Sequence, residues 1–590
     1  MTNMTNAILR GKPVLRIRAA GRPVLAIFAT ALPLLAFAKT YCNPMDLDYR
    51  FAVKQFADKG KAKPFREAAD PELLRHQGAY YLFASHSGGY WKSSDLVKWS
   101  FIPARGLPIE RWDPSVRLMN GELAYTSSNA KRFYRAVDID KGIWEAYPQP
   151  FLDVFAPSFL IDDDGRAYVY GNKSGKDRKK PLLDGEEFDP KTHRRIGEKV
   201  GIYDCDPENL GWERRGDTNE KTERPYNEGV FMSKHRGRYY LQYGSPGTEF
   251  DGHCEAMLVS ERPLGPFRLQ TSNPFVYRAD GFATGIGGGA VSVDEFGNWW
   301  HVGNTKVKVR HIFERRLSLD PVFFDDDGDM YCPALWGDYP REMPRRKLKG
   351  PEEALPKWML LSCGCRASAS SADEKHPAKF AVDEQIGTWW AAQGAEPGEW
   401  LAVDLGRAAT IASVQVNFAD EGCEGFYGRE RAVDYRYAVE TSDDGKDWRR
   451  RVDVSKGLGR DATSPYHELG APVRARHVRV VNLGCNCPKF SVSGLRVFGR
   501  DDGPAPAAPQ NVRVVRDGCR ATVRWDAVPG AEGYAVMFGF KPKFLYLGRR
   551  VRGACTLDLT MLNAKSAYYL EVVAFNGAGL STPSARLRVE

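Results

Sequence analysis

The stretch His76-Gln77-Gly78-Ala79-Tyr80-Tyr81-Leu82 is one copy of a phrase that recurs through the first 330 residues. In each copy a glycine preceded by a polar or turn-forming residue closes a hairpin, and an aromatic or β-branched strand follows. The other copies are Met119-Asn120-Gly121-Glu122-Leu123, Asp163-Asp164-Gly165-Arg166-Ala167-Tyr168, His235-Arg236-Gly237-Arg238-Tyr239-Tyr240 and Glu295-Phe296-Gly297-Asn298-Trp299-Trp300. The turn glycines are 43, 44, 72 and 60 residues apart.

Units of that size, built from short antiparallel strands, are typical of propeller blades. The sequence therefore predicts an all-β protein whose residues 39–342 form a five-bladed β-propeller. A β-sandwich with many hairpins would give a similar pattern and is the alternative. The chain of 590 residues is too long for a single core, so further domains are expected.

A second regularity lies eight or nine residues before the turn glycines. The first four copies read Asp70-Pro71, Asp113-Pro114, Ala156-Pro157 and Glu228-Gly229. The innermost strand of each blade lines the central channel, so these positions should converge at one end of it. Two carboxylates that face each other across a pocket are what glycoside hydrolysis needs, one to activate water and one to protonate the leaving oxygen. For any single Asp-Pro, the alternative is simply the start of a strand.

These residues carry a resemblance to glycoside hydrolase family 43. The matching segments are Ala69-Asp70-Pro71-Glu72-Leu73, Ser93-Ser94-Asp95-Leu96-Val97-Lys98-Trp99, Phe159-Leu160-Ile161-Asp162-Asp163-Asp164-Gly165, Asn227-Glu228-Gly229-Val230-Phe231, Pro263-Leu264-Gly265-Pro266-Phe267 and Pro321-Val322-Phe323. The resemblance implies an inverting hydrolase of arabinose-, xylose- or galactose-containing glycans, of the α-L-arabinofuranosidase or β-xylosidase type. It also implies that Asp70 is the general base and Glu228 the general acid.

The sequence departs from the family at the third carboxylate. The family has an aspartate before proline in the third blade, where this chain has Ala156, whereas the second blade has Asp113 in place of the usual alanine. We hypothesise that Asp113 supplies the charge that keeps the acid protonated. The alternative is a decayed propeller that only binds glycan, as a lectin or adhesion protein. A phosphorylase on a related scaffold is a third interpretation, but the sequence reveals no cationic phosphate pocket.

Three further residues are candidates for substrate binding. Trp91 and Trp112 could stack on a sugar ring, and Arg315 could orient a carboxylate or bind a hydroxyl group. Core packing, for the tryptophans, and a surface ion pair, for the arginine, are the alternatives. We expect no cofactor and no metal, because Ile286 stands where many family members have a histidine associated with a central ion or water cluster.

The last third of the chain is predicted to form two accessory modules. After a linker at 343–360, residues 361–500 resemble a discoidin, or coagulation factor five/eight C-type, domain. This resemblance implies a jelly-roll β-sandwich, which could bind a polysaccharide. It rests on Trp400-Leu401-Ala402-Val403-Asp404-Leu405-Gly406, Glu440-Thr441-Ser442-Asp443-Asp444-Gly445-Lys446-Asp447-Trp448 and Ala475-Arg476-His477-Val478-Arg479-Val480.

A Pro/Ala-rich linker at 501–508 separates this module from the last one. Residues 509–590 resemble a fibronectin type III domain, which is an immunoglobulin-like β-sandwich. The segments that match are Val523-Arg524-Trp525, Gly533-Tyr534-Ala535-Val536 and Tyr568-Tyr569-Leu570-Glu571-Val572-Val573-Ala574-Phe575-Asn576. Such modules usually act as spacers.

The first 38 residues have the layout of a secretory signal peptide. A basic region precedes an apolar run that ends in Ala36-Phe37-Ala38. This predicts a secreted or periplasmic protein without a membrane span. The net charge of +9 falls to +4 without this segment, which gives little reason to expect a nucleic-acid partner.

The eleven cysteines fit an oxidising compartment. Cys363-Gly364-Cys365 and Cys485-Asn486-Cys487 bracket one segment, and disulfides between its ends are favoured over a zinc site because the spacing is not that of zinc ligands. Cys519 and Cys555 could pair within the last domain.

Overall fold

The computed structural model describes residues 39–53, 64–108, 111–172, 181–423, 425–428 and 432–590. Lys39–Glu590 form one compact unit, and the expected signal segment 1–38 lies outside the described residues. Strands dominate the described residues, which confirms the all-β class; the helices there are short 3-10 turns, none of them long and apolar enough to span a membrane. They are η1 (Gly211–Glu213), η2 (Pro351–Ala354) and η3 (Ala378–Ala381).

Five antiparallel sheets follow one another in chain order through the first half of the described chain. They are β2 (Ala69–His76), β3 (Ala79–Ser85), β4 (Gly89–Ser93) and β5 (Ser100–Pro103); β6 (Ser115–Met119), β7 (Glu122–Thr126), β8 (Arg132–Asp138) and β9 (Ile143–Pro150); β10 (Phe155–Ile161), β11 (Ala167–Asn172), β12 (Leu183–Phe188) and β13 (Arg195–Tyr203); β14 (Glu228–His235), β15 (Arg238–Ser245), β16 (Cys254–Ser260), β17 (Arg268–Leu269) and β18 (Val276–Tyr277); and β19 (Thr284–Val293), β20 (Trp299–Lys306), β21 (Arg315–Phe324) and β22 (Met330–Tyr331).

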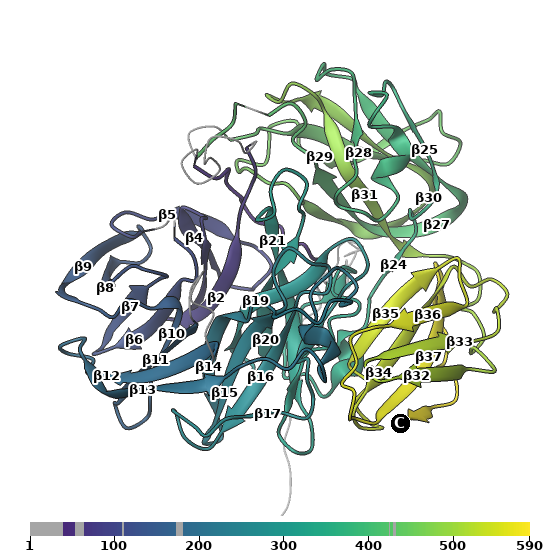
Figure 1. Cartoon of the computed structure of the whole chain (residues 1–590). Helices are drawn as coiled ribbons and strands as arrows, with labels where there is room; N and C mark the ends of the chain where they lie inside the picture. Colours follow the sequence, from purple (N-terminus) through teal and green to yellow (C-terminus); the bar gives the residue numbers. More distant parts are fainter. Residues whose placement is uncertain (1–38, 54–63, 109–110, 173–180, 424, 429–431) are drawn as a thin grey trace, which may run out of the picture. The chain divides into compact units, whose positions relative to one another are not determined.

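The first strands of successive sheets lie against one another, and β19 of the last sheet returns to β2 of the first (Figure 1). The five sheets therefore close into a ring with their first strands innermost. The short strands β1 (Thr40–Tyr41) and β23 (Arg341–Glu342) pair with each other, so the two ends of this part of the chain meet.

The recurring glycines close hairpins between the first and second strands of all five sheets. In the first, second and fourth sheets the loop has two residues, Gln77-Gly78, Asn120-Gly121 and Arg236-Gly237, and both residues have positive φ. This is the backbone of a type I′ turn, whose twist matches that of the flanking strands, and glycine adopts it without strain. The sequence prediction of these hairpins is confirmed.

An eight-stranded sheet system follows, built on two 19-residue strands. Its strands are β24 (Met359–Leu360), β25 (Arg366–Ala369), β26 (Trp390–Ala391), β27 (Trp400–Phe418), β28 (Arg436–Ser442), β29 (Arg449–Asp453), β30 (Tyr466–Gly484) and β31 (Ser491–Arg500). Strand β24 lies within the stretch that the sequence suggested as linker, yet it already pairs with β31.

The C-terminal residues form a three-stranded and a five-stranded sheet. The first contains β32 (Arg513–Asp517), β33 (Arg520–Arg524) and β36 (Thr556–Leu559); the second contains β34 (Gly533–Gly539), β35 (Leu547–Arg552), β37 (Tyr568–Asn576), β38 (Gly579–Leu580) and β39 (Leu587–Val589). Trp212 of η1 reaches this region and donates its indole N–H to the Asn563 side chain at 2.8 Å. Apolar side chains of the fourth sheet and of the C-terminal sheets thus share one hydrophobic cluster.

A buried arginine joins the ring of sheets to the eight-stranded system. Arg66, 1% exposed, donates to both carboxylate oxygens of Asp420, at 2.6 and 3.2 Å, and lies 2.7 Å from an Asp461 oxygen. Burial disfavours charge on Arg66, but the two carboxylates raise its pKa above the ordinary value. The guanidinium therefore stays charged, and it is the main counter-charge of these two buried carboxylates.

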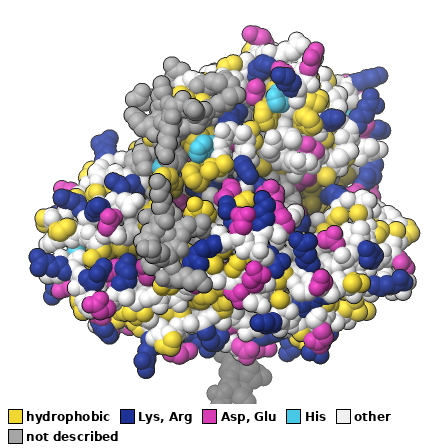
Figure 2. All heavy atoms as spheres, in the orientation of Figure 1, with side chains coloured by type: hydrophobic (Ala, Val, Ile, Leu, Met, Phe, Trp, Pro, Cys, Tyr) yellow, Lys and Arg dark blue, Asp and Glu magenta, His cyan; other side chains and the backbone are white. Residues whose placement is uncertain are grey.

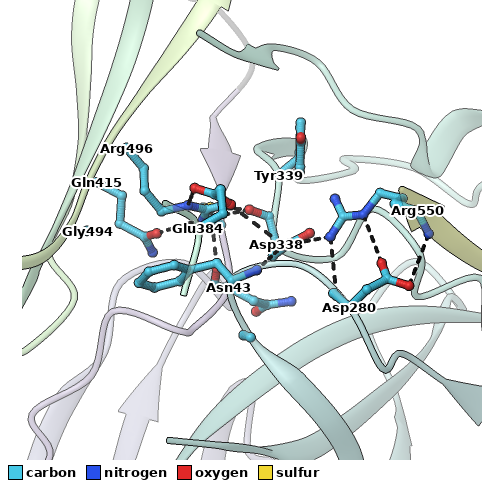
Figure 3. A network of polar contacts seen from close by, with 12 residues as sticks. Asn43, Asp280, Asp338, Tyr339, Glu384, Gln415, Gly494, Arg496 and Arg550 are labelled. Atoms are coloured by element: carbon cyan, nitrogen blue, oxygen red, sulfur yellow. Dashed lines mark hydrogen bonds and ion pairs between the residues drawn. The ribbon is translucent and has the colours of Figure 1, made fainter. Parts of the chain in front are cut away.

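A second junction gathers around Asp338 (Figure 3). Its carboxylate accepts a hydrogen bond from Arg550 of β35 at 2.8 Å, and its carbonyl oxygen accepts one from Arg496 of β31 at 2.7 Å. Arg496 also forms an ion pair with Glu384 at 2.9 Å. Burial opposes ionisation of Asp338, but the charges of Arg550 and Arg496 lower its pKa below the ordinary range. One aspartate thus connects the ring to both later parts of the chain.

The disulfide pairs suggested by the sequence are absent among the described cysteines. The Cys519 thiol points toward the carbonyl oxygen of Asn209, at 3.5 Å, whereas Cys555 lies against the Tyr534 hydroxyl. Cys487 lies against Cys423 and Cys485, and no disulfide links it to the Cys363 segment. These expectations were wrong because each thiol packs against a different neighbour from the one that sequence spacing suggested.

We expect Arg66→Met to lower the free energy of unfolding by roughly 3–5 kcal/mol, because it removes the main counter-charge of the buried Asp420 and Asp461. Urea unfolding followed by tryptophan fluorescence measures the effect. The matched control is Arg135→Met, whose side chain is 44% exposed and pairs with two exposed carboxylates. Its loss should be much smaller, because exposed ion pairs contribute little to stability. Equal losses in the two variants would contradict a special role for the buried junction.

Candidate active site

The first strands of the ring share an unusual backbone feature at their beginnings. Asp70, Asp113 and Ala156 have φ angles of 47°, 55° and 48°, and Gly229 and Gly285 have 63° and 67°. L-residues seldom adopt this left-handed region. In four of the five sheets, the pairing of the first strand shifts at this point, as in a β-bulge. The side chains of Asp70 and Asp113 line the same pocket.

The backbone N–H groups of three of these residues donate hydrogen bonds to side chains of the preceding sheet. The backbone N–H of Asp70 is 3.3 Å from Asn304 Oδ1, that of Asp113 is 2.9 Å from Ser85 Oγ, and that of Ala156 is 2.7 Å from Ser128 Oγ. Each serine hydroxyl then donates to the carboxylate of its own sheet. Ser85 binds Asp70 at 2.6 Å, and Ser128 binds Asp113 at 2.7 Å. The carboxylates are therefore oriented by the same contacts that register one sheet against the next.

Glu228 reaches the same site through a different local geometry. It begins β14, half-buried, and the residue that occupies the left-handed position is its neighbour Gly229. Gly288 of β19 lies beside Gly229, and a Cβ on Gly288 would come within 3.3 Å of an Asp70 oxygen. One pocket is lined by Asp70, Asp113, Gly229 and Gly288. Because the two glycines have no side chains, they leave room for carboxylates of different sheets to approach one another.

Arg315 is the cation of this site. It is buried, and its guanidinium donates to Glu67 at 2.6 Å, to Asp70 at 3.3 Å and to the Thr248 hydroxyl at 3.1 Å. Burial opposes its charge, but the carboxylates of Glu67 and Asp70 raise the pKa of Arg315 above the ordinary value. Burial also raises the pKa of Glu67, to about 8, against the opposing charge of Arg315. Arg315 is thus no surface ion-pair residue, which was the alternative left open by the sequence.

Asp113 lies within electrostatic range of the other site carboxylates. Burial raises its pKa well above the ordinary value, and the charges of Asp70 and Glu228 raise it further. The Ser128 hydroxyl and the more distant Arg315 act in the opposite direction. Because several carboxylates share one nearby guanidinium, the site favours retaining a proton. Such an arrangement can hold one carboxylate ionised beside a protonated one.

The two tryptophans proposed for substrate binding differ in their environments. Trp112 is half-buried at the site, edge-on to His86 at 4.8 Å and to Phe313 at 6.3 Å between ring centroids. Trp91 is 0% exposed and packs against Tyr49 and Phe101 in a hydrophobic core. The assignment of Trp91 to the substrate site is therefore wrong, because its strand β4 turns the ring into the sheet interior.

Sequence reasoning missed several residues that build the site. Glu67 stands three positions before Asp70. The pair Arg66-Glu67 directly before a strand predicted to be buried was the sequence signal that could have indicated its role. Ser85 and Ser128 carry no distinctive pattern, because their role depends on the sheet that follows them. His253, which is buried, lies against Gly287; burial and the charge of Arg315 lower its pKa to about 3, so it is neutral.

No group of three or more histidine, cysteine, aspartate or glutamate side chains in the described chain is placed to hold a metal ion. Ile286, at the position where the sequence comparison suggested a histidine, is buried in an apolar cluster between the fourth and fifth sheets. The described site therefore consists of carboxylates, hydroxyl groups, one guanidinium and aromatic rings.

Known proteins resemble parts of this chain. The Escherichia coli (strain K12) protein named "Putative beta-xylosidase" is 25% identical over 302 residues, which are 45% of this chain and 51% of that protein. The chain thus spans about half the length of this curated relative. A solved structure titled "Glycoside hydrolase" has a TM-score of 0.42 and 19% identity, with 73% of this chain and 97% of that chain covered.

A second solved structure, a thermostable family-43 glycoside hydrolase, has a TM-score of 0.40 and 21% identity, with 52% of this chain and 100% of that chain covered. Family models match two segments of the chain. Residues 63–330, which contain the carboxylate site, match Glycosyl hydrolases family 43, and residues 366–493 match the F5/8 type C domain. The first of these segments is therefore similar to glycosyl hydrolases of family 43, and the second to F5/8 type C, or discoidin, domains.

Proposed function

We propose that this protein is an inverting glycoside hydrolase of arabinose-, xylose- or galactose-containing glycans, with Asp70 as general base and Glu228 as general acid. The observation that carries the proposal is the meeting of carboxylates from separate sheets around a single buried guanidinium. The family 43 domain at 63–330 supports the same reaction class. The five sheets then correspond to the five blades of a propeller, and the pocket lies at one end of its channel.

In the proposed mechanism, Asp70 removes a proton from the attacking water. Hydrogen bonds from Ser85 and Arg315 orient its carboxylate and compensate its charge. Glu228 donates a proton to the leaving oxygen as the glycosidic bond breaks, and water adds to the opposite face of the sugar. Asp113 acts on Glu228 through charge, and Trp112 offers an aromatic edge at the rim to the sugar ring.

The rest of the chain serves this reaction in the proposal. The discoidin domain binds the polysaccharide that carries the substrate, and the two C-terminal sheets form a fibronectin type III spacer. The segment 1–38 directs export. A nucleic-acid partner has little support, because lysine and arginine side chains are interspersed with aspartate and glutamate on the face seen in Figure 2.

Asp70→Asn and Glu228→Gln should each lower kcat/KM by at least about 10²-fold on arabinan, xylan or galactan oligosaccharides. The two variants should differ on aryl glycosides with an acidic phenol as leaving group. Such a group departs without protonation, so Glu228→Gln should retain much more activity than Asp70→Asn. Initial rates of phenol and reducing-sugar release measure both effects.

Asp153→Asn is the matched control, because Asp153 is an exposed carboxylate that pairs with Lys131 and does not line the pocket. It should behave as the wild type does. If the wild-type protein binds a glycan but releases no more sugar than the Asp70 variant, the protein is a glycan-binding propeller and the loss of an aspartate at Ala156 is the reason.

Asp113→Asn should lower kcat/KM by roughly tenfold at pH 7 and move the alkaline limb of the pH profile to lower pH. Like-charge repulsion between Asp113 and Glu228 makes the pair retain one proton to higher pH, and this repulsion is lost in the amide. Asparagine can still accept the Ser128 hydrogen bond. The pH dependence of kcat/KM on an aryl glycoside is the measurement.

A measurement of thermal stability distinguishes a loss of activity caused by the missing charge from one caused by unfolding. Because folding raises the pKa of Asp113, its ionisation costs stability once the pH exceeds the ordinary carboxyl value of roughly 4. Asp113→Asn removes this cost, so the unfolding temperature at pH 7 should rise or stay the same while activity falls. An unchanged pH profile would remove Asp113 from the proposed machinery.

A further inference from the structure

A cleft of about 840 Å³ lies away from the carboxylate site. Its walls include the β14–β15 turn, the start of β20, the β21–β22 turn and the segment from Lys347 to Glu352. Glu228 begins β14 and His235 ends it, so the length of this eight-residue strand, roughly 25 Å, separates the two places. The cleft has the volume of a small-ligand site.

Three aromatic rings in mutual contact line this cleft. The centroid of His235 is 5.1 Å from that of Trp299 and 4.5 Å from that of Phe324, and the last two are 5.4 Å apart. All three side chains are half-buried, so the rings are packed on one side and accessible on another. A rigid aromatic surface of this kind suits the C–H face of a sugar ring.

Four exposed cations, Arg236, Lys347, Lys349 and Lys543, line the cleft. Arg236 and Lys347 are the two whose charges act on the aromatic group His235. Burial lowers the pKa of His235, and the positive charges of Arg236 and Lys347 lower it further. Both cations therefore act on the same aromatic group, whose ring is neutral at neutral pH.

The backbone that carries Lys347 is fixed on both sides. The Asn298 amide donates to the Arg346 carbonyl at 3.0 Å and accepts from the Leu348 N–H at 2.7 Å. Asn298 is itself buried and bonded to Asp294 at 2.8 Å. The position of Lys347 over the cleft is thus built into the fold.

Most acidic groups of the cleft already have cationic partners. Lys541 binds Asp325 at 2.6 Å and Asp327 at 2.5 Å, and Arg238 pairs with Glu261 at 3.4 Å. Asp326 and Glu352 also line the cleft and are exposed. These two carboxylates would repel a ligand with a negative charge on every unit, so the cleft favours a ligand with isolated charges.

We propose that this cleft is a second glycan-binding site, specific for a neutral sugar chain that carries occasional uronic acid groups. Neutral rings stack on Trp299, Phe324 and His235, and a uronate carboxylate faces Arg236 and Lys347. The site holds an acidic side group of the polysaccharide away from the carboxylate pocket. Glycan binding at this site does not depend on hydrolysis, so a failure of the proposed reaction would not contradict the site.

The test uses the full chain with Asp70→Asn, so that no probe is cleaved. The probes are glucuronic acid-bearing xylan oligosaccharides and the same oligosaccharides with the carboxyl group reduced to an alcohol. Titration calorimetry should show binding of the acidic probe at least about tenfold tighter than that of the reduced one, because charge-assisted contacts are lost on reduction. Adding Arg236→Ala and Lys347→Ala should remove this preference.

Arg262→Ala with Arg345→Ala is the matched control, because it removes two exposed cations that do not line the cleft. It should leave both affinities unchanged. The proposal is overturned if the wild-type site binds both probes equally, if the control pair loses the preference as well, or if polyglutamate competes as strongly as the acidic oligosaccharide. The last result would mean a simple charge patch without sugar recognition.

Discussion

A backbone N–H group in an unusual conformation needs an acceptor, and the carboxylate site depends on how this need is met. Asp70, Asp113 and Ala156 all have left-handed φ angles at the start of an inner strand. In each case the acceptor is a side chain of the preceding sheet, namely Asn304, Ser85 or Ser128. Because Asn304 belongs to the last sheet and Asp70 to the first, the same contact also closes the ring. The orientation of the carboxylates and the register of the sheets therefore have one physical cause.

Each candidate catalytic carboxylate is also supported from a different later part of the chain. Arg66, anchored by Asp420 and Asp461, immediately precedes Glu67, which holds Arg315 against Asp70. On the other side, Trp212 is bonded to Asn563 of the C-terminal region. The next residue after Trp212, Glu213, accepts a hydrogen bond at 3.2 Å from Asn227, the neighbour of Glu228. The eight-stranded system and the C-terminal sheets thus stabilise the two edges of the site, in addition to any binding role of their own.

The charge balance of the site follows from burial. One guanidinium, that of Arg315, faces Glu67, Asp70 and, at longer range, Glu228. Water cannot compensate this excess of carboxylates, so protons do, as the raised pKa values of Glu67 and Asp113 indicate. The exchange of aspartate and alanine between Asp113 and Ala156 moves a charge by one sheet, and Ser128 bonds to both positions. A neighbouring sheet can therefore supply charge to the same pocket.

The sequence alone determined the all-β class, the five hairpins and the recurring position of Asp70 and Asp113, because turn chemistry and strand alternation are local properties of the chain. The resemblance added the family and the role proposed for Glu228. The sequence did not separate Trp112 beside Asp113 from Trp91 in a core, since the burial of a side chain depends on neighbours that are distant in the chain. Nor did it reveal that Glu67, Ser85 and Ser128 contribute to the site, or which groups the cysteine thiols contact. Only the tertiary structure decided these, because burial, proton affinity and hydrogen-bond partners arise between sheets that lie far apart in the chain.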